Sequence, residues 1–329
     1  MAYGSASVDT FNTSTGQVFS PASSSATMKN RIINGDHRID QRNAGASVTP
    51  ASGASTYITD RFSVLQTQSS KFSAQQNAGS VTPPPGFSNY LGFTSLSAAT
   101  IGAGDLFRGF YPMEGYAISD LAWGTANAKP VTLSFWARSS LTGNFGICLQ
   151  NSSNNRAYAA SYNIPVANTW TYCSITIPGE TTGTWGSNNS LGLAINFDLG
   201  SGANNLIAPG SWQAVNANGA TGCVPLVGTS GATLYLTGIQ LEVGTVASAF
   251  DFRHYTTELQ LCQRYYEQLN GTGSSSAALI SNPYAGTSAN QWITWTFKQT
   301  KRTTPTVINF NATTISSYSY VTGIFPSPD

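Results

Sequence analysis

The sequence contains few charged residues. Asp, Glu, Lys and Arg make up 9% of its 329 residues, against about a quarter in an average soluble protein. The formal net charge is +1, which gives no electrostatic reason to expect nucleic acid or an anionic membrane as a partner. Aromatic residues nevertheless make up 12%, which argues against a disordered chain because such chains lack the apolar groups of a core. We expect a rigid protein whose surface carries hydroxyl and amide groups.

Long apolar runs and closely spaced cysteines are also missing. No window approaches the ~18 consecutive apolar residues of a membrane-spanning helix. The N-terminus lacks the basic start and apolar run of a secretory signal. The four cysteines are far apart in the chain, at Cys148, Cys173, Cys223 and Cys262. We expect buried, reduced thiols; a disulfide between Cys148 and Cys173 is the alternative, and spacing alone does not decide between them.

Most of the chain between residues 29 and 250 reads as short strands separated by turn residues. The clearest alternating apolar patterns cover residues 131–137, 170–177, 191–197 and 233–241. Segments rich in Gly, Pro and Asn separate them. Many short strands with almost no helix indicate an all-β fold, a sandwich or a barrel.

One helix is predicted, between residues 257 and 270. Thr257 and Gln260 have the spacing of a capping box, and Leu259 and Cys262 begin an apolar face. Asn270 and the glycine after it would end the helix. Three parts are therefore expected: an N-terminal arm at residues 1–28, a β domain at residues 29–255, and a unit at residues 256–329 that combines the helix with a small β sheet.

The few charges are concentrated in two clusters, one near each end of the β domain. Both signs are interleaved, so we expect the clusters to pair with each other and to hold the two ends of the domain together as a clasp. The candidate clasp residues are Asp36, Arg38, Arg42, Asp60, Arg61, Glu242, Arg253 and Arg264.

Motifs for catalysis or cofactor binding are not found, and we expect neither a cofactor nor a metal. Glycoside cleavage usually needs two carboxylates roughly 5–10 Å apart; Asp36 and Asp40 are the nearest candidates, but ion pairing with arginine is favoured. His37 and His254 lie in the charged clusters. A metal site that joins them with Asp36 or Asp251 is an alternative to buried, hydrogen-bonded imidazoles.

Sugar binding requires an exposed aromatic face surrounded by amide and hydroxyl groups. Trp123, Trp185 and Trp212 each lie among Gly, Asn and Ser residues, so they are the candidate carbohydrate-binding residues. A role in the core or in a subunit contact is the alternative for each of them.

Several segments resemble the tail-fibre and related appendage proteins of bacteriophages and prophages. Residues 34–42 (NGDHRIDQR) resemble the family's opening N-G-D-F-R-I-x-Q-R, and residues 57–62 (YITDRF) resemble its Y-T-x-D-R-[WF] element. Residues 131–137 resemble its T-x-S-F-W-x strand. The most extensive likeness lies in residues 240–267, which match its closing Q-L-E-x-G…C-Q-R-Y-Y-E element nearly position for position. Residues 301–307 resemble its M-R-x-x-P-T-V strand, with Lys301 in place of Met.

The first and last strands also resemble a jelly-roll carbohydrate-binding module. This resemblance implies that the β domain is a jelly-roll β-sandwich. Many such modules bind a structural calcium through a Glu and an Asp, whose positions correspond here to Arg38 and Thr237. A guanidinium at a ligand position argues against calcium, which requires oxygen ligands.

The resemblance implies a non-enzymatic structural protein of the virion, a tail fibre or short fibre, assembled in the bacterial host cytoplasm. It further implies a homotrimer whose N-terminal arm binds other virion proteins and whose body contacts a host surface polysaccharide. A head-decorating fibre of the capsid and a glycan depolymerase are the alternatives.

Overall fold

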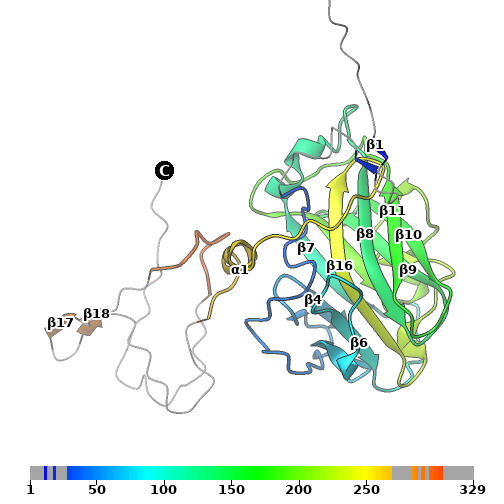
Figure 1. The fold of residues 1–329 in the computed structure, drawn as a ribbon, viewed down its shortest axis with the longest axis horizontal. Helices are drawn as coiled ribbons and strands as arrows, with labels where there is room; N and C mark the ends of the chain where they lie inside the picture. Colours follow the sequence, from blue (N-terminus) through cyan, green and yellow to red (C-terminus); the bar gives the residue numbers. More distant parts are fainter. Residues whose placement is uncertain are drawn as a thin grey trace, which may run out of the picture.

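The computed structural model describes residues 11–12, 18–19, 28–268, 284–287, 290–292 and 296–306. Two antiparallel sheets lie face to face and form a jelly-roll β-sandwich (Figure 1). The five-stranded sheet has the order β11 (Thr171–Ile177), β8 (Val131–Ser139), β16 (Thr233–Val243), β6 (Leu91–Ser95) and β5 (Phe72–Gln76). The seven-stranded sheet has the order β14 (Trp212–Gln213), β10 (Ala157–Ile164), β9 (Gly143–Asn151), β12 (Leu191–Asp198), β7 (Phe107–Glu114), β4 (Ser63–Gln66) and β3 (Thr56–Tyr57). The all-β jelly-roll expectation is therefore confirmed.

The remaining elements are short. The 3-10 turns are η1 (Ala78–Ser80), η2 (Gly115–Ala117), η3 (Ser119–Leu121), η4 (Ala203–Asn205) and η5 (Leu226–Gly228). Small sheets pair β1 (Phe11–Asn12) with β2 (Val18–Phe19), β13 (Leu206–Ile207) with β15 (Gly219–Ala220), and β17 (Tyr284–Thr287) with β18 (Asn290–Trp292). No helix in the described part of the chain is long and apolar enough to cross a membrane.

Aromatic side chains between the sheets form the centre of the core. Phe135 of β8 contacts Tyr162 of β10 and Phe197 of β12 edge-on, with ring centroids 4.9 and 5.4 Å apart. Such edge-to-face contacts are favoured because the positive ring edge meets the negative ring face. All three side chains are buried. In each of these strands every second side chain points to the same face, and these three point to the inner face of their sheets.

Strand β16 is the central strand of its sheet and the last strand of the sandwich in chain order. Its pairing with β8 shifts register between Thr237 and Gln240. Gly238 lies in this bulge with φ of 62°, and a Cβ there would lie 2.6 Å from the Phe87 ring. Glycine is favoured here because it adopts the left-handed conformation of the bulge without strain and leaves room for the Phe87 ring.

The helix differs from the sequence prediction at both ends. Helix α1 spans Tyr255–Gln263, with His254 at its N-cap and no side-chain capping bond, so the expected capping box of Thr257 and Gln260 is wrong. Its C-cap is Arg264, well before the predicted end at residue 270. The chain leaves the helix early because Tyr265 and Tyr266 lie over arginines of the sandwich.

The thiols and the C-terminal strands complete the comparison. All four cysteines are free, and Cys148 and Cys173 lie on β9 and β11, in different sheets, so the alternative disulfide is wrong. Residues 301–306 contain no strand. Of the small β sheet expected in residues 256–329, the described residues include β17 and β18.

Candidate functional site

Asn30 joins the start of the β domain to its last strand. Its side-chain nitrogen donates to the Ile239 carbonyl oxygen at 3.1 Å, and its side-chain oxygen accepts from the Leu241 amide at 3.1 Å. The Asn30 amide itself donates to Asp251 Oδ2 at 3.2 Å. One buried amide side chain therefore makes two hydrogen bonds to the backbone of β16, as a neighbouring strand would.

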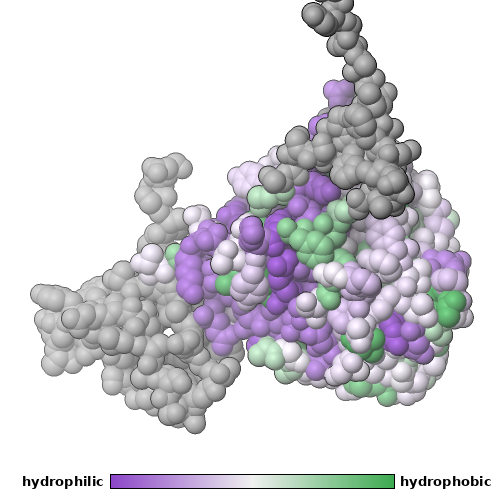
Figure 2. Space-filling model, in the orientation of Figure 1, coloured by the Kyte–Doolittle hydropathy of each residue, from purple (hydrophilic) through white to green (hydrophobic). Residues whose placement is uncertain are grey.

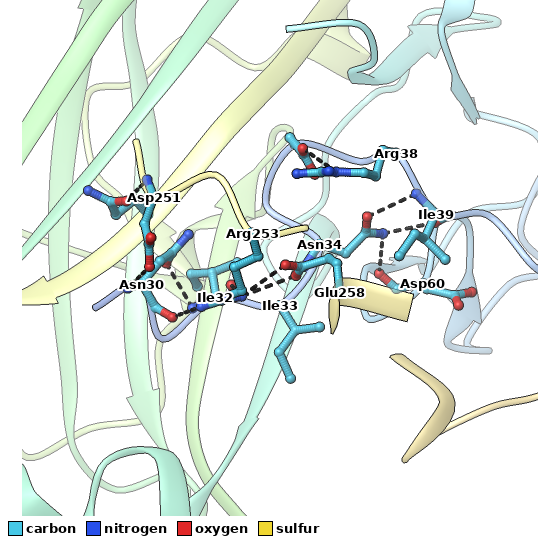
Figure 3. Close-up of polar contacts among 12 residues, drawn as sticks. Asn30, Ile32, Ile33, Asn34, Arg38, Ile39, Asp60, Asp251, Arg253 and Glu258 are labelled. Atoms are coloured by element: carbon cyan, nitrogen blue, oxygen red, sulfur yellow. Dashed lines mark hydrogen bonds and ion pairs between the residues drawn. The ribbon is translucent and has the colours of Figure 1, made fainter. Parts of the chain in front are cut away.

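Arg253 and Glu258 connect this segment to α1. Arg253 Nη1 donates to both carboxylate oxygens of Glu258, at 3.1 and 3.2 Å. The same guanidinium donates to the carbonyl oxygens of Asn30 and Ile32, and Glu258 accepts from the Asn34 amide. The two side chains are 6% and 5% exposed. The two charges of this buried pair meet, and the pair also bonds three backbone groups of residues 30–34 (Figure 3).

A second part of the clasp lies under the chain that follows α1. Asp60 accepts from Gln41 and from Arg42, whose Nη1 lies 3.5 Å from Asp60 Oδ1. The Arg42 guanidinium lies 3.7 Å from the centroid of the Tyr266 ring. Burial raises the pKa of Asp60 to about 6, against the opposing effects of Gln41 and Arg42.

Arg61 is buried without a carboxylate partner among the described residues. Its guanidinium lies between two aromatic rings, 3.4 Å from the centroid of Tyr265 and 5.3 Å from that of Tyr111. It also donates to the Pro112 carbonyl oxygen. The tyrosines after the helix therefore cover arginines of their own chain.

The other predicted clasp residues pair locally or with the sandwich. Asp36 pairs with Arg38 at 2.6 Å, so Arg38 forms an ion pair where a calcium ligand would stand. Glu242 accepts from the Ser248 amide at 2.8 Å. Arg264 pairs with Glu114 of β7 at 3.0 Å. The ion pairs of the predicted clasp residues thus form within one cluster or with Glu114, and the two clusters are joined by hydrogen bonds to backbone groups instead.

The two histidines lie in different environments. His37 is completely buried; its Nδ1 is 3.0 Å from Thr59 Oγ1, and its ring packs on Phe62 at 4.3 Å. Burial lowers the pKa of His37 to about 3. His254 is exposed at the start of α1, so only one of the two is a buried imidazole. The described residues contain no group of three or more His, Cys, Asp and Glu side chains placed to hold a metal.

The described carboxylates are all engaged by donors. Asp36 has its arginine, and Asp40 accepts from the Asn43 and Gly45 amides at 2.9 and 2.7 Å. The others are held in the same ways, at Asp60, Asp105, Glu114, Asp120, Glu180, Asp198, Glu242, Asp251, Glu258 and Glu267. Asp36 and Asp40 therefore stabilise the loops in which they lie.

The three predicted carbohydrate-binding tryptophans meet at one place. Trp123, Trp185 and Trp212 form a mutual cluster with ring centroids 4.8, 5.3 and 5.4 Å apart and interplanar angles of 73–81°. Tyr158 of β10 extends it, 5.3 Å from Trp212. Trp123 is buried, whereas Trp185 and Trp212 are half-buried. Accessible ring surface therefore comes from Trp185 and Trp212, which Trp123 supports from below.

The indole nitrogens of this tryptophan cluster fix the surrounding loops. Trp123 donates to the Lys129 carbonyl oxygen, Trp185 to that of Thr182 and Trp212 to that of Pro178, at 2.8–3.1 Å. Exposed hydroxyl groups at residues 181, 182 and 184 lie in the same loop as Trp185. Below them, Arg156 pairs with Glu180 at 2.8 Å. The cluster is thus a rigid aromatic surface beside a polar loop.

The clasp also borders an open hollow of about 520 Å³. Met28, Tyr116 and Val243 line it together with Arg31 and Arg253, and the three apolar side chains are 43–60% exposed. Figure 2 shows that the surface around α1 is mainly hydrophilic and that an apolar patch lies beside it. The hollow lies where the chain from residue 28 enters the sandwich.

Sequence reasoning missed a polar group on the outer face of the seven-stranded sheet, around Arg108 and Phe110. The signal was present in the alternation of residues 107–114 (FRGFYPME), which places both residues on one face. A single arginine in such a pattern does not by itself indicate a site, because a solvent-facing position of a strand often carries one.

No protein-family model matches the sequence, and no curated protein matches it. Solved structures show a similar shape. The enzymatically active domain of bacteriophage CBA120 tailspike protein 4 aligns with a TM-score of 0.32 and 12% identity, covering 67% of this chain and 22% of that one. The family 11 carbohydrate-binding module of Clostridium thermocellum Lic26A-Cel5E aligns with a TM-score of 0.30 and 12% identity, covering 62% and 98%.

A third similar structure is the CBM22-1 xylan-binding domain of Paenibacillus barcinonensis Xyn10C, with a TM-score of 0.30 and 8% identity over 60% of this chain and 99% of that one. The chain thus spans about a fifth of the tailspike chain and nearly all of the two modules. These likenesses concern the fold.

Proposed function

We propose that this chain is the body of a bacteriophage appendage, a tail fibre or short fibre, that contacts a host surface glycan without cleaving it. The likeness of residues 30–310 to phage appendage proteins, described above, supports the virion role. The tryptophan cluster is the observation that carries the binding role. Two half-buried indoles held rigidly beside an exposed polar loop provide the stacking face and the hydrogen-bonding groups that a sugar ring needs.

The angles within the tryptophan cluster define what can bind. Because Trp185 and Trp212 are nearly perpendicular, at 81°, they do not form one flat platform for several consecutive sugars. Each offers its own face, so the cluster suits one or two sugar rings at a bend or at the end of a glycan. Rings already ordered by packing lose little conformational entropy on binding, which favours affinity.

Binding of host polysaccharide by the purified chain tests this role. Trp185→Ala and Trp212→Ala should each weaken binding roughly tenfold, which corresponds to about 1.4 kcal/mol. Trp136→Ala is the matched control, because Trp136 is also half-buried and contacts an aromatic ring, Tyr172 at 5.3 Å, but lies in the five-stranded sheet. Equal losses in all three variants would contradict a site at the tryptophan cluster.

The non-enzymatic part of the proposal is supported by the engaged carboxylates. Retaining and inverting glycosidases both depend on two carboxyl groups that flank the substrate, and each described Asp and Glu side chain has hydrogen-bond donors of its own. Incubation with host polysaccharide should therefore release no new reducing ends. Release that is abolished by Asp36→Asn or Asp40→Asn would establish a depolymerase instead.

Assembly as a homotrimer is part of the same proposal. The exposed apolar residues of the hollow beside the clasp support a contact between copies at this end. Sedimentation of the full chain should give a trimer, and Tyr116→Asp, which places a charge on a 60% exposed side chain, should weaken it. A concentration-independent monomer would contradict the trimer.

The place where residues 1–28 attach distinguishes a tail fibre from a head-decorating fibre of the capsid. Labelling of the N-terminus in intact virions should place it on the tail, and a label on the capsid would establish a head-decorating fibre.

A further inference from the structure

The outer face of the seven-stranded sheet carries a second polar site. On β7, Arg108 and Phe110 alternate with buried residues and are themselves half-buried. The strand registers place Asp198 opposite Arg108 and Asn196 opposite Phe110 on β12. Directly paired residues of antiparallel strands point to the same face, so these four side chains share one face of the sheet, on which Asn196 and Asp198 are buried.

Arg108 has no carboxylate partner among the described residues, although Asp198 is its direct neighbour. Asp198 Oδ1 instead accepts from the Gly200 and Ser201 amides at 3.0 and 2.8 Å, in the turn after β12. Seven of the described cations form ion pairs, and the buried Arg61 lies between two tyrosine rings. Arg108, like Arg61 and Arg138, therefore has no counter-charge within the described part of the chain.

Neutral groups hold Arg108 in place. Its Nη1 donates to the side-chain oxygens of Asn196 and Asn218, at 2.8 and 2.5 Å. Both amides are fixed in turn, since Asn196 donates to the Cys148 carbonyl oxygen and Asn218 to Asn205. Its Cζ lies 4.8 Å from the centroid of the Phe110 ring.

The donors of Arg108 are only partly used. No described residue accepts from Nη2, whereas Nε, which also lacks a partner, is buried out of reach of a ligand. A charged donor that no protein group satisfies is completed by water or by a ligand. Arginine remains charged at neutral pH. The site is therefore a fixed positive charge with free hydrogen-bonding capacity beside a half-buried aromatic ring.

We propose that Arg108 and Phe110 bind the carboxylate of an acidic sugar, such as a hexuronic acid residue of a host glycan. The Nη2 group of a fixed guanidinium can donate a charge-assisted hydrogen bond to a carboxylate oxygen. One cation among neutral amides balances a single negative charge, which favours a carboxylate over a doubly charged phosphate. Phe110 supplies an apolar surface for the sugar ring. This site is separate from the tryptophan cluster and does not depend on it.

Calorimetric titration of the full chain with oligogalacturonate and with its methyl ester tests the proposal. The acid form should bind and the neutral ester should not. Arg108→Gln should weaken binding at least roughly tenfold, as expected when a hydrogen-bonded charge is removed. Arg138→Gln is the matched control: Arg138 is also half-buried, lies over an aromatic ring at 5.4 Å and has no carboxylate partner among the described residues. It should bind as the unaltered chain does.

Two further variants keep the test decisive if Arg108→Gln loosens the segment around Asn218. Arg108→Lys retains the charge without the two hydrogen bonds that fix the guanidinium and should give an intermediate loss. Phe110→Ala should weaken binding without removing charge. Unaltered melting temperatures verify the fold of each variant.

Several results would overturn this inference. They are equal binding of the acid and the ester, equal affinity in Arg108→Gln, no binding by the unaltered chain, or competition by inorganic phosphate as strong as by free galacturonate. Glycan binding that is lost in Trp185→Ala but kept in Arg108→Gln would refute this site and support binding at the tryptophan cluster.

Discussion

Arg253 and Glu258 form a buried ion pair, 3.1 Å between Nη1 and Oε1, that connects the start of α1 to the first residues of the sandwich. The pair lies five residues apart in sequence, yet its remaining hydrogen bonds reach back more than two hundred residues, to Asn30, Ile32 and Asn34. It therefore closes the sandwich at the point where the chain enters and leaves it.

Arg253→Ala should strongly destabilise the protein. The substitution leaves the Glu258 carboxylate buried without its cation and frees two carbonyl oxygens, which in comparable buried pairs costs about 3–5 kcal/mol. Thermal and urea unfolding measure the loss. Asp120→Asn is the control, because the Arg31–Asp120 pair lies at the surface with Asp120 55% exposed, and such pairs contribute about 0–1 kcal/mol. Similar losses in the two variants would contradict the clasp.

His37 and Asp60 should give opposite dependences of stability on pH. The pKa of His37 is about 3 in the folded protein, against 6.5 for an unperturbed histidine, so only the unfolded chain takes up a proton between these values. Its contribution to stability is lost as pH falls from about 6.5. The pKa of Asp60 is about 6 instead of 3.8, so the folded protein retains a proton that the unfolded chain releases. That contribution is lost as pH rises from about 3.8 to 6.

The two effects should nearly cancel between pH 4 and 6, each having a slope of about 1.4 kcal/mol per pH unit. Asp60→Asn should therefore reveal a stability that rises with pH in this range, and His37→Gln one that falls. Urea unfolding at several pH values measures the slopes, which do not depend on the absolute stability of each variant. A parallel response of the two variants would contradict the assignment.

The thiols should react in the order of their burial. Burial raises the pKa of Cys173 to about 12 and that of Cys223 to about 11, and it also raises the pKa of Cys148 and Cys262. Thiolate is the reactive form, so a thiol reagent near neutral pH should modify the folded protein slowly. Cys223, which alone is not buried, should react first. Mass spectrometry of partly labelled protein identifies the site; early labelling of Cys148 would contradict the packing of β9.

Part of this architecture could be read from the sequence. Strong alternation in residues 131–137 and 233–241 predicted two strands that the structure extends to Val131–Ser139 and Thr233–Val243, because burial of one face imposes a period of two. The helix boundaries could not be read in the same way. Local capping patterns were outweighed by tertiary contacts, in which Arg42 and Arg61 hold Tyr266 and Tyr265 against the sandwich.

For the candidate sites too, the sequence indicated the residue types but not which residues come together. The residue types around Trp123, Trp185 and Trp212 indicated sugar binding, but only strand pairing and loop closure could reveal that the three rings meet. The neighbourhood of Arg108 depends even more on tertiary structure, since its hydrogen-bonding partners Asn196 and Asn218 lie 88 and 110 residues away. No local pattern encodes such pairings.

Gly35→Ala should disrupt the crossing between the first segment and β16. The Gly35 carbonyl oxygen accepts from the Ile239 amide at 2.9 Å, and a Cβ at residue 35 would collide with the Ile239 carbonyl oxygen. Because a backbone atom cannot move aside as a flexible side chain does, we expect a loss of about 1–3 kcal/mol or more, as for overpacked sites. Gly104→Ala is the control, since a Cβ there meets nothing within 4 Å. Urea unfolding measures both, and equal stability of the two variants would show that the first segment does not pack against β16 this closely.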